Sequence, residues 1–189
     1  VLGGVIAVAI DGDRYPQRAR ITALITCLVT LALCIPLYLD FNPALSRMQF
    51  QENIPWISVY NINYSLGIDG ISLPLILLTI FTTLLVILAA WRSVTLRVAQ
   101  YMAAFLMMQG MMVGTFAATD SILFYVFWEA ILIPMYLSIG VWGSDNRSYA
   151  SIKFFLYTFF GSALMLIALL YLGVHNPQQN FLIASFYPL

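Results

Sequence analysis

Few residues in this chain could carry chemistry, and the most informative of them is a glutamate inside an apolar run. Glu129 lies near the middle of LFYVFWEAILIPMY, residues 123–136, and the other side chains between Ile122 and Gly140 are uncharged. If this run crosses a membrane, a carboxylate at that depth is costly. Such residues usually face a bundle interior or a hydrated path, so Glu129 is predicted to belong to an ion route.

Helical geometry predicts that polar groups lie near this glutamate. Tyr125 at i−4 and Tyr136 at i+7 share its face of a helix and offer hydroxyls that could hold water. Pro134 cannot donate to the carbonyl of Ala130, which predicts a free carbonyl and a kink at that point. The alternative is a structural glutamate that is paired with a cation on another helix.

Other polar side chains also lie in apolar runs. Lys153 begins the run SIKFFLYT and is a candidate proton donor or counter-charge, although a lysine at a helix end also reaches the lipid headgroups. Gln109 could support a water chain with Thr26 and Thr30. These three are equally suited to hydrogen bonds between helices.

The motifs of soluble enzymes are absent from the sequence. It has no glycine-rich phosphate loop, no Cys and His cluster with metal spacing and no G-x-S-x-G elbow. Its one histidine, His175, follows the last apolar run and is predicted to be a loop or interfacial residue. No bound cofactor or metal is therefore expected in this chain, and its chemistry is expected inside a membrane or on partners.

The elements that must position these residues are long apolar helices. Of 189 residues, 62% are hydrophobic and 8% charged, and the mean hydropathy is +0.91. Soluble domains are roughly a quarter charged, so the composition predicts one all-α domain, a polytopic transmembrane helix bundle. The net charge of zero argues against a nucleic-acid surface. The apolar runs, each near the length that a crossing requires, lie at 21–39, 71–91, 98–118, 121–142 and 151–173, with a partial run near 1–10.

The connectors complete the expected topology of six helices. The long connector 40–69 is predicted to be an extramembrane loop, with a hairpin or a strand. Lys and Arg are concentrated in the first, third and fifth connectors or just beyond, at Arg14, Arg18, Arg20, Arg92, Arg97, Arg147 and Lys153, whereas the second holds only Arg47. Because cytoplasmic loops carry the basic excess, the odd connectors are predicted to be cytoplasmic and the N-terminus to lie outside. The chain is expected to be a fragment of a longer protein, since it begins at a valine inside an apolar run.

Two motifs resemble the antiporter-like membrane subunits of respiratory complex I. FYVFWEAILIPMYLSIGVWG, followed by KFFLYT, is similar to the region from helix five to helix six. The WE-x-x-L-x-P-M-Y pattern favours the group formed by bacterial chain M of NADH:quinone oxidoreductase and mitochondrial chain 4. LGIDGISLPLILLT, residues 66–79, resembles the entry into helix three. The resemblance extends over about residues 20–173.

This resemblance implies a subunit of about fourteen helices that translocates protons while electrons pass from NADH to quinone. It makes Glu129 the counterpart of the essential glutamate of helix five, and Lys153 that of a lysine at the start of helix six. In the family the glutamate pairs with a lysine on a broken seventh helix, which is absent from this sequence. NADH, FMN, iron–sulfur clusters and quinone would be bound elsewhere in the complex. The implied partners are sister antiporter-like chains and the lipid bilayer, in a bacterial inner membrane rather than a mitochondrial one.

Other functions remain open from the sequence. A cation/proton antiporter subunit or a membrane-bound hydrogenase subunit would share this set of helices, and the transported ion could be H⁺ or Na⁺. A non-transporting membrane scaffold that docks redox subunits would hold Glu129 in a fixed ion pair. A quinone-binding enzyme has little support, because no residues suggest a headgroup site.

Overall fold

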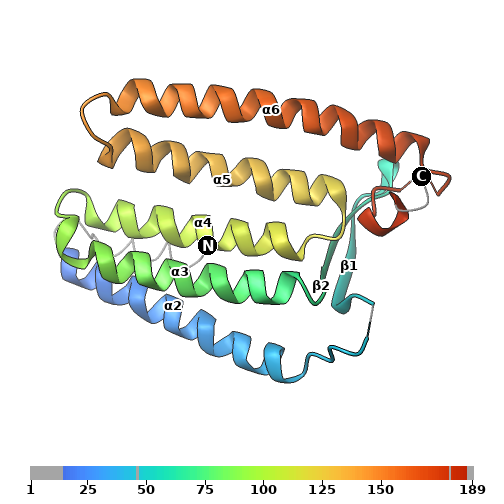
Figure 1. Ribbon diagram of the computed structural model, residues 1–189, viewed down its shortest axis with the longest axis horizontal. Coiled ribbons are helices and arrows are strands. Elements are labelled where there is room, and N and C mark those ends of the chain that lie inside the picture. Colours follow the sequence, from blue (N-terminus) through green and yellow to red (C-terminus); the bar gives the residue numbers. More distant parts are fainter. Residues whose placement is uncertain (1–14, 46, 179, 187–189) are drawn as a thin grey trace.

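Helices arranged side by side make up most of the computed structural model, which describes residues 15–45, 47–178 and 180–186. Successive helices run in opposite directions, and a two-stranded hairpin covers one end of the bundle (Figure 1). The elements are α2 (Pro16–Leu39), β1 (Gln49–Ile57), β2 (Ile62–Ile68), α3 (Ser72–Ser93), α4 (Val98–Ala117), α5 (Ser121–Trp142) and α6 (Arg147–His175), with 3₁₀ turns at Ser58–Tyr60 and Ile183–Phe186.

Four of these helices are long and apolar enough to cross a membrane, namely α2, α3, α5 and α6. The longest, α6, has 29 residues, which makes it about 43 Å long. That exceeds the roughly 30 Å of a hydrocarbon core, so its ends reach the headgroup regions. The remaining α-helix among the described residues, α4, packs against α2, α3 and α5 and lies between them.

The observed helix bounds differ from the apolar runs mainly at the basic end. The helix α5 covers the expected residues 121–142. However, α2 begins at Pro16 rather than 21, and α6 begins at Arg147 rather than 151. Polar side chains at a membrane surface do not interrupt backbone hydrogen bonds, so both helices extend beyond their apolar parts. The partial run near 1–10 lies outside the described residues.

The connector 40–69 contains an antiparallel hairpin. Gln49 pairs with Ile68 and Ile57 with Ile62, and Asn61 closes the turn in the left-handed region with φ 51°. The strand β2 is largely buried and contacts α4 and α5, whereas β1 is exposed along nearly its whole length. The hairpin is therefore attached to the bundle through β2.

The hydrophobic core lies among α2, α3 and α4. One cluster joins all three helices and another joins α2, β2 and α3. The first cluster consists of Ala23, Cys27, Ile87, Ala90, Val98, Met102 and Leu106. The pair α5 and α6 joins this core through contacts between α5 and α4.

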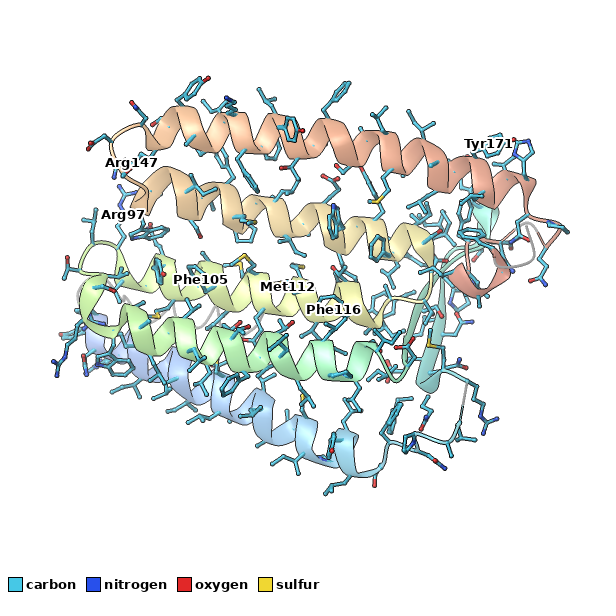
Figure 2. All side chains as sticks on the ribbon, viewed as in Figure 1. Arg97, Phe105, Met112, Phe116, Arg147 and Tyr171 are labelled. Atoms are coloured by element: carbon cyan, nitrogen blue, oxygen red, sulfur yellow. The ribbon has the colours of Figure 1, made fainter. Side chains whose placement is uncertain are left out.

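Basic residues gather at the end of the bundle opposite the hairpin. The start of α2, the α3–α4 connection and the α5–α6 connection all meet there, and Figure 2 shows Arg97 and Arg147 at this end and Tyr171 at the other. Arg20 holds the α3–α4 connection by donating to the carbonyl of Val94 (3.0 Å). Of the arginines predicted to share one side of a membrane, those that the structure describes share one end of the bundle, namely Arg18, Arg20, Arg92, Arg97 and Arg147.

Candidate functional site

Glu129 lies well inside α5. The helix begins after Asp120, whose carboxylate accepts hydrogen bonds from the backbone N–H groups of Ile122 and Leu123. Such a side-chain cap satisfies donors that have no partner within the helix. Glu129 follows Ser121 by eight residues, which puts it about 12 Å along a helix of about 33 Å. A membrane-crossing α5 therefore carries this carboxylate at depth.

The surroundings of Glu129 leave one of its oxygens without a partner. The side chain is half-buried, and its Oε1 atom is buried and has no hydrogen-bond partner among the described residues. The Tyr125 hydroxyl lies within interaction range of both the Glu129 carboxylate and the Ser162 hydroxyl on α6. Ser162 is 6% exposed. A carboxylate and two hydroxyls thus meet where α5 faces α6.

The carboxylate and the two hydroxyls lie close together because of the register between α5 and α6. A Cβ added at Gly140 would lie 3.3 Å from Ser151 Oγ, so the two helices approach closely there. Tyr136 packs edge-on against Phe155 of α6, with ring centroids 5.7 Å apart. Tyr125 and Tyr136 therefore both face α6, and Tyr136 lies about two turns from Glu129.

Trp128, next to Glu129, lines a cleft between α5 and α6. The cleft has a volume of about 300 Å³ and its α6 side is formed by Tyr157, Thr158, Gly161, Ser162 and Met165. The Trp128 ring also stacks on Phe124, with centroids 5.9 Å apart. Ser162 therefore lines the cleft and also lies near Tyr125, and its hydroxyl donates to the carbonyl of Phe159 (2.9 Å).

Pro134 is buried on the other side of α5, toward α4. It lines a cavity of about 230 Å³ between these helices, together with Gln100, Ala103, Ala104, Met107, Ile133, Leu137, Val141 and Trp142. The helix continues through Pro134, and the Ser138 hydroxyl donates to the Pro134 carbonyl (2.8 Å). A proline N lacks the hydrogen needed to bond the carbonyl four residues earlier, so α5 is locally weaker one turn beyond Glu129.

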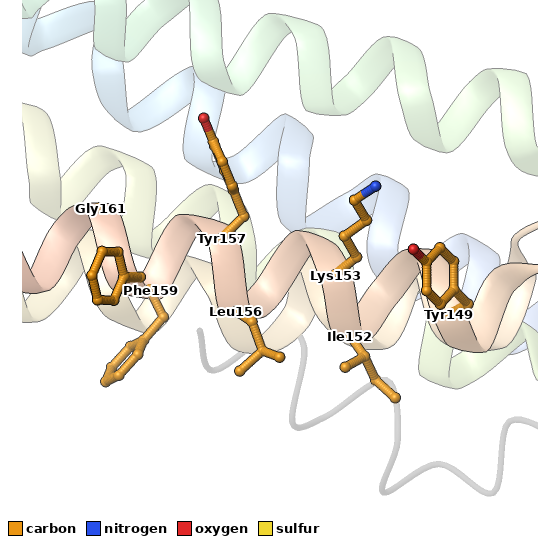
Figure 3. Close-up of a pocket in the computed structure, with 8 residues that line it drawn as sticks. Tyr149, Ile152, Lys153, Leu156, Tyr157, Phe159 and Gly161 are labelled. Carbon is orange, nitrogen blue, oxygen red and sulfur yellow. The ribbon is translucent and has the colours of Figure 1, made fainter.

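Lys153 is not brought to Glu129. Its Nζ lies 5.7 Å from the centroid of the Tyr149 ring, on an exposed face of α6. Figure 3 shows Lys153 among the residues of a shallow pocket formed by α6, of about 840 Å³. Ser162, which faces the Glu129 region, is nine residues further on, about 13 Å along the axis. The two charges predicted from the sequence are therefore separated within the described residues.

Gln109 points away from Glu129. Its side chain is 5% exposed, and its Oε1 accepts from the Cys27 thiol of α2 at 3.4 Å. Thr26 and Thr30 donate to backbone carbonyls of their own helix, at Thr22 and Thr26. Within the described residues these groups form contacts within or between helices and do not approach Glu129.

Sequence reasoning missed Ser162. Ser162 lies 33 residues from Glu129 in the chain, and only the register of α5 against α6 brings them together. Its one signal was a small polar residue beside Gly161 in an apolar run. Among the described residues no group of three or more His, Cys, Asp or Glu could hold a metal ion.

Comparisons with known proteins agree with this architecture. Residues 20–119 match the family described as NADH-ubiquinone oxidoreductase chain 4, amino terminus. Residues 118–183 match the one described as NADH:quinone oxidoreductase/Mrp antiporter, TM. The chain is 46% identical over 159 residues to NADH-quinone oxidoreductase subunit M of Rhodobacter capsulatus, which covers 84% of this chain and 30% of that protein.

Another related protein and a solved structure are also similar to this chain. The chain is 37% identical over 165 residues to F(420)H(2) dehydrogenase subunit M of Methanosarcina mazei, covering 87% of this chain and 33% of that protein. A chain in the structure of respiratory complex I from Thermus thermophilus with bound NADH superposes with a TM-score of 0.79 at 27% identity, over 89% of this chain and 34% of that one. This chain thus spans about a third of the length of these relatives.

The resemblance drawn from two short motifs is confirmed by matches that together run from residue 20 to residue 183. Apolar helices of crossing length and membrane-complex relatives agree that the chain is embedded in a membrane. The chain belongs to the family of NADH-ubiquinone oxidoreductase chain 4, the counterpart of subunit M of the bacterial enzyme.

Proposed function

We propose that this chain is part of a membrane subunit that translocates protons, driven by electron transfer from NADH to quinone in other subunits, and that Glu129 is a carboxylate of the proton path. The single observation that carries the role of Glu129 is its unpartnered oxygen. Oε1 is buried in a membrane-crossing helix and has no hydrogen-bond partner among the described residues. A buried carboxylate oxygen left in this way is costly unless a cation, a proton or water reaches it.

A mechanism for proton uptake and release at Glu129 follows from electrostatics. In a low-dielectric interior, a cation close to a carboxylate favours its ionised form, and moving the cation away favours protonation. Lys153, a cation of α6, lies about 13 Å along that helix from Ser162, the residue that faces the Glu129 region; its Nζ lies over the Tyr149 ring instead. The cation is therefore expected from another part of the subunit. Its approach and withdrawal would drive release and uptake of a proton at Glu129.

The path to Glu129 runs through the α5–α6 interface. Tyr125 and Ser162 supply hydroxyls that can relay a proton or hold a water molecule. The cleft beside Trp128 gives such water room next to Ser162. Pro134 weakens α5 on the far side of Glu129, so a small movement of the carboxylate between two partners is compatible with the helix.

The same proposal also covers the cofactors, the partners, the membrane and the orientation of the chain. The chain itself would bind no cofactor, and NADH, FMN, iron–sulfur clusters and quinone would belong to other subunits. Sister antiporter-like subunits and the lipid bilayer would be its partners, in a bacterial inner membrane. The basic end of the bundle would face the cytoplasm, because short cytoplasmic loops carry the Lys and Arg excess, and the N-terminus would lie outside.

The test is Glu129→Gln in the complete complex, assayed in sealed membrane vesicles. NADH oxidation by quinone and acidification of the vesicle interior are measured together. Loss of the ionisable group is expected to lower proton transfer by about tenfold or more. The matched control is Asp145→Asn, which removes an exposed carboxylate from the connection between α5 and α6 and should leave both rates unchanged. Normal proton pumping by an assembled Glu129→Gln complex would refute the proposal.

A second function is favoured by one observation. The family match over residues 118–183, which contains Glu129, is described by both NADH:quinone oxidoreductase and Mrp antiporter. A cation/proton antiporter subunit would use the same carboxylate for exchange without electron transfer. Proton movement in the same vesicles, driven by an imposed Na⁺ gradient in the absence of NADH, would indicate this alternative.

A further inference from the structure

Asp120 connects the hairpin to the helix that carries Glu129. The side chain is fully buried. Its Oδ1 accepts from the backbone N–H groups of Ile122 (2.9 Å) and Leu123 (3.2 Å) in the first turn of α5. Its Oδ2 accepts from the backbone N–H of Asn63 in β2, at 3.1 Å. One carboxylate therefore both caps α5 and attaches it to an extramembrane strand.

The segment around Asp120 is held from two sides. On the β2 side, Thr119 donates to the carbonyl of Ser65 (3.0 Å), and its hydroxyl donates to that of Ser65 (2.7 Å). On the other side, Ser121 donates to the carbonyl of Phe181 (2.8 Å) and Ile183 donates to that of Thr119 (2.9 Å). The start of α5 is thus fixed between the hairpin and the segment after α6.

The part of α5 between Asp120 and Glu129 is suited to transmit a displacement. Residues 121–130 contain neither glycine nor proline, so this stretch is an unbroken helix. It places Glu129 about 13 Å from Asp120. Beyond Glu129, Pro134 interrupts the ladder of backbone hydrogen bonds. A movement at the hairpin end therefore reaches Glu129 through a stiff segment, whereas the remainder of α5 is more weakly coupled.

A comparable cap at the same end of the bundle lacks this connection. Asp69 begins α3 by accepting from the backbone N–H groups of Ile71 (3.0 Å) and Ser72 (2.7 Å). Its side chain remains partly exposed, and the hydrogen bonds of its carboxylate stay within its own turn. Asp120 has the same capping role, and it adds burial and a hydrogen bond to another element.

We propose that Asp120 is a positioning residue that links the β1–β2 hairpin to α5 and thereby sets the position of Glu129 relative to Tyr125 and Ser162. The inference rests on the proposed role of Glu129 in proton transfer. A partner that moves the exposed hairpin would alter proton transfer at Glu129 through this link. The part of this link that involves the capping carboxylate is the hydrogen bond from Asn63 N–H to Asp120 Oδ2, next to the two hydrogen bonds from Thr119 to Ser65.

Two substitutions remove the hydrogen bond between Asn63 and Asp120 while leaving most of the cap. Asp120→Asn keeps one carbonyl oxygen for the first turn of α5, but an amide NH₂ then faces the Asn63 N–H. Asn63→Pro removes that N–H and leaves the Asp120 carboxylate intact; its ladder partner, Pro55, also lacks an N–H. In the complete complex, each variant is expected to lower protons pumped per electron by at least about twofold and to shift the pH profile of pumping.

The double variant separates a shared link from two unrelated defects. If both substitutions break one hydrogen bond, the double variant should be no worse than the more severe single variant. The matched control is Asp69→Asn, the same substitution in the turn before α3, which keeps one oxygen for the hydrogen bonds of that turn and should leave protons per electron and the pH profile unchanged.

Several outcomes would overturn the inference. They are unchanged pumping in assembled single variants, fully additive losses in the double variant, or failure of both single variants to assemble while Asp69→Asn assembles, which would make the link merely structural. Glu129→Gln, measured alongside, distinguishes the two proposals. If that variant pumps normally, the proposed function fails. If it does not pump while both link variants pump normally, only the positioning role fails.

Discussion

The three-helix group α2, α3 and α4 and the pair α5 and α6 are built on different principles. The three-helix group has buried hydrophobic clusters, and beside them the buried amide of Gln109 accepts from the Cys27 thiol. The pair α5 and α6 holds Glu129, one of whose buried oxygens has no hydrogen-bond partner among the described residues. Lipid provides no hydrophobic driving force between helices, so association depends on close packing and polar contacts. The two regions therefore differ in the polar groups that they bury, a paired amide in the first and an unpartnered carboxylate oxygen in the second.

The largest effect is expected where the two regions join. A Cβ added at Gly114 of α4 would lie 2.8 Å from ring atoms of Phe127 on α5. Gly114→Ala should therefore force α4 and α5 apart and lower the free energy of unfolding by about 1–3 kcal/mol. The thermal midpoint of the complex in detergent measures this loss.

Two further variants test whether the loss is steric. Gly70→Ala is the control, because an added Cβ there meets nothing within 4 Å and should leave the midpoint unchanged. Phe127→Leu in the Gly114→Ala background should restore part of the stability by making room. If no stability returns, the contact between Gly114 and Phe127 is not what joins the two regions.

A smaller effect is expected within the three-helix group. Gln109→Leu removes the acceptor for the Cys27 thiol and should cost about 0.6 kcal/mol, the average for hydrogen bonds between membrane helices. Protons pumped per electron should not change, because Gln109 faces α2 and not Glu129. A loss of pumping comparable to that of Glu129→Gln would show that the proton path enters the three-helix group and would remove the distinction between the two regions.

The sequence predicted the helices better than their ends. The bounds of α5 could be read because the apolar run 121–142 extends over the whole helix. The start of α6 could not, because Arg147 and its neighbours continue the helix outside the apolar part. The hairpin could only be suspected, since its pairing depends on the contacts that β2 makes with α4 and α5.

For the candidate site too, the positions of some residues could be predicted from the sequence and those of others could not. The placement of Tyr125 beside Glu129 follows from a spacing of four residues, which a helix brings to one face. Ser162 depends on the register between two helices, and the direction of Gln109 depends on which face of α4 meets α2. Neither the place of Ser162 nor the direction of Gln109 can be read from the spacing of residues along one helix. The same holds for Lys153, whose position near a helix start did not reveal that it faces away from α5.

The smallest predicted effect concerns two capping aspartates, one in each region. Hydrogen bonds from the Ser72 backbone, followed by weaker ones, hold the pKa of Asp69 below its ordinary value. Burial instead raises the pKa of Asp120, against hydrogen bonds from Asn63, Leu123 and Ile122. The two carboxylates should therefore contribute to stability with opposite dependence on pH.

The sign can be tested by comparing each aspartate with its asparagine variant between pH 3 and pH 7, roughly the range in which carboxylates titrate. The stability that Asp69 contributes is present above the pKa of the unfolded chain and is lost as the pH falls through its lower folded value. The contribution of Asp120 is greatest below the unfolded pKa and declines as the pH rises through its higher folded value. The thermal midpoint of the wild type minus that of Asp69→Asn should thus shrink on acidification, whereas the difference for Asp120→Asn should grow. Parallel pH dependence of the two differences would mean that the carboxylates have equivalent surroundings, which would contradict the burial that sets the cap of α5 apart from that of α3.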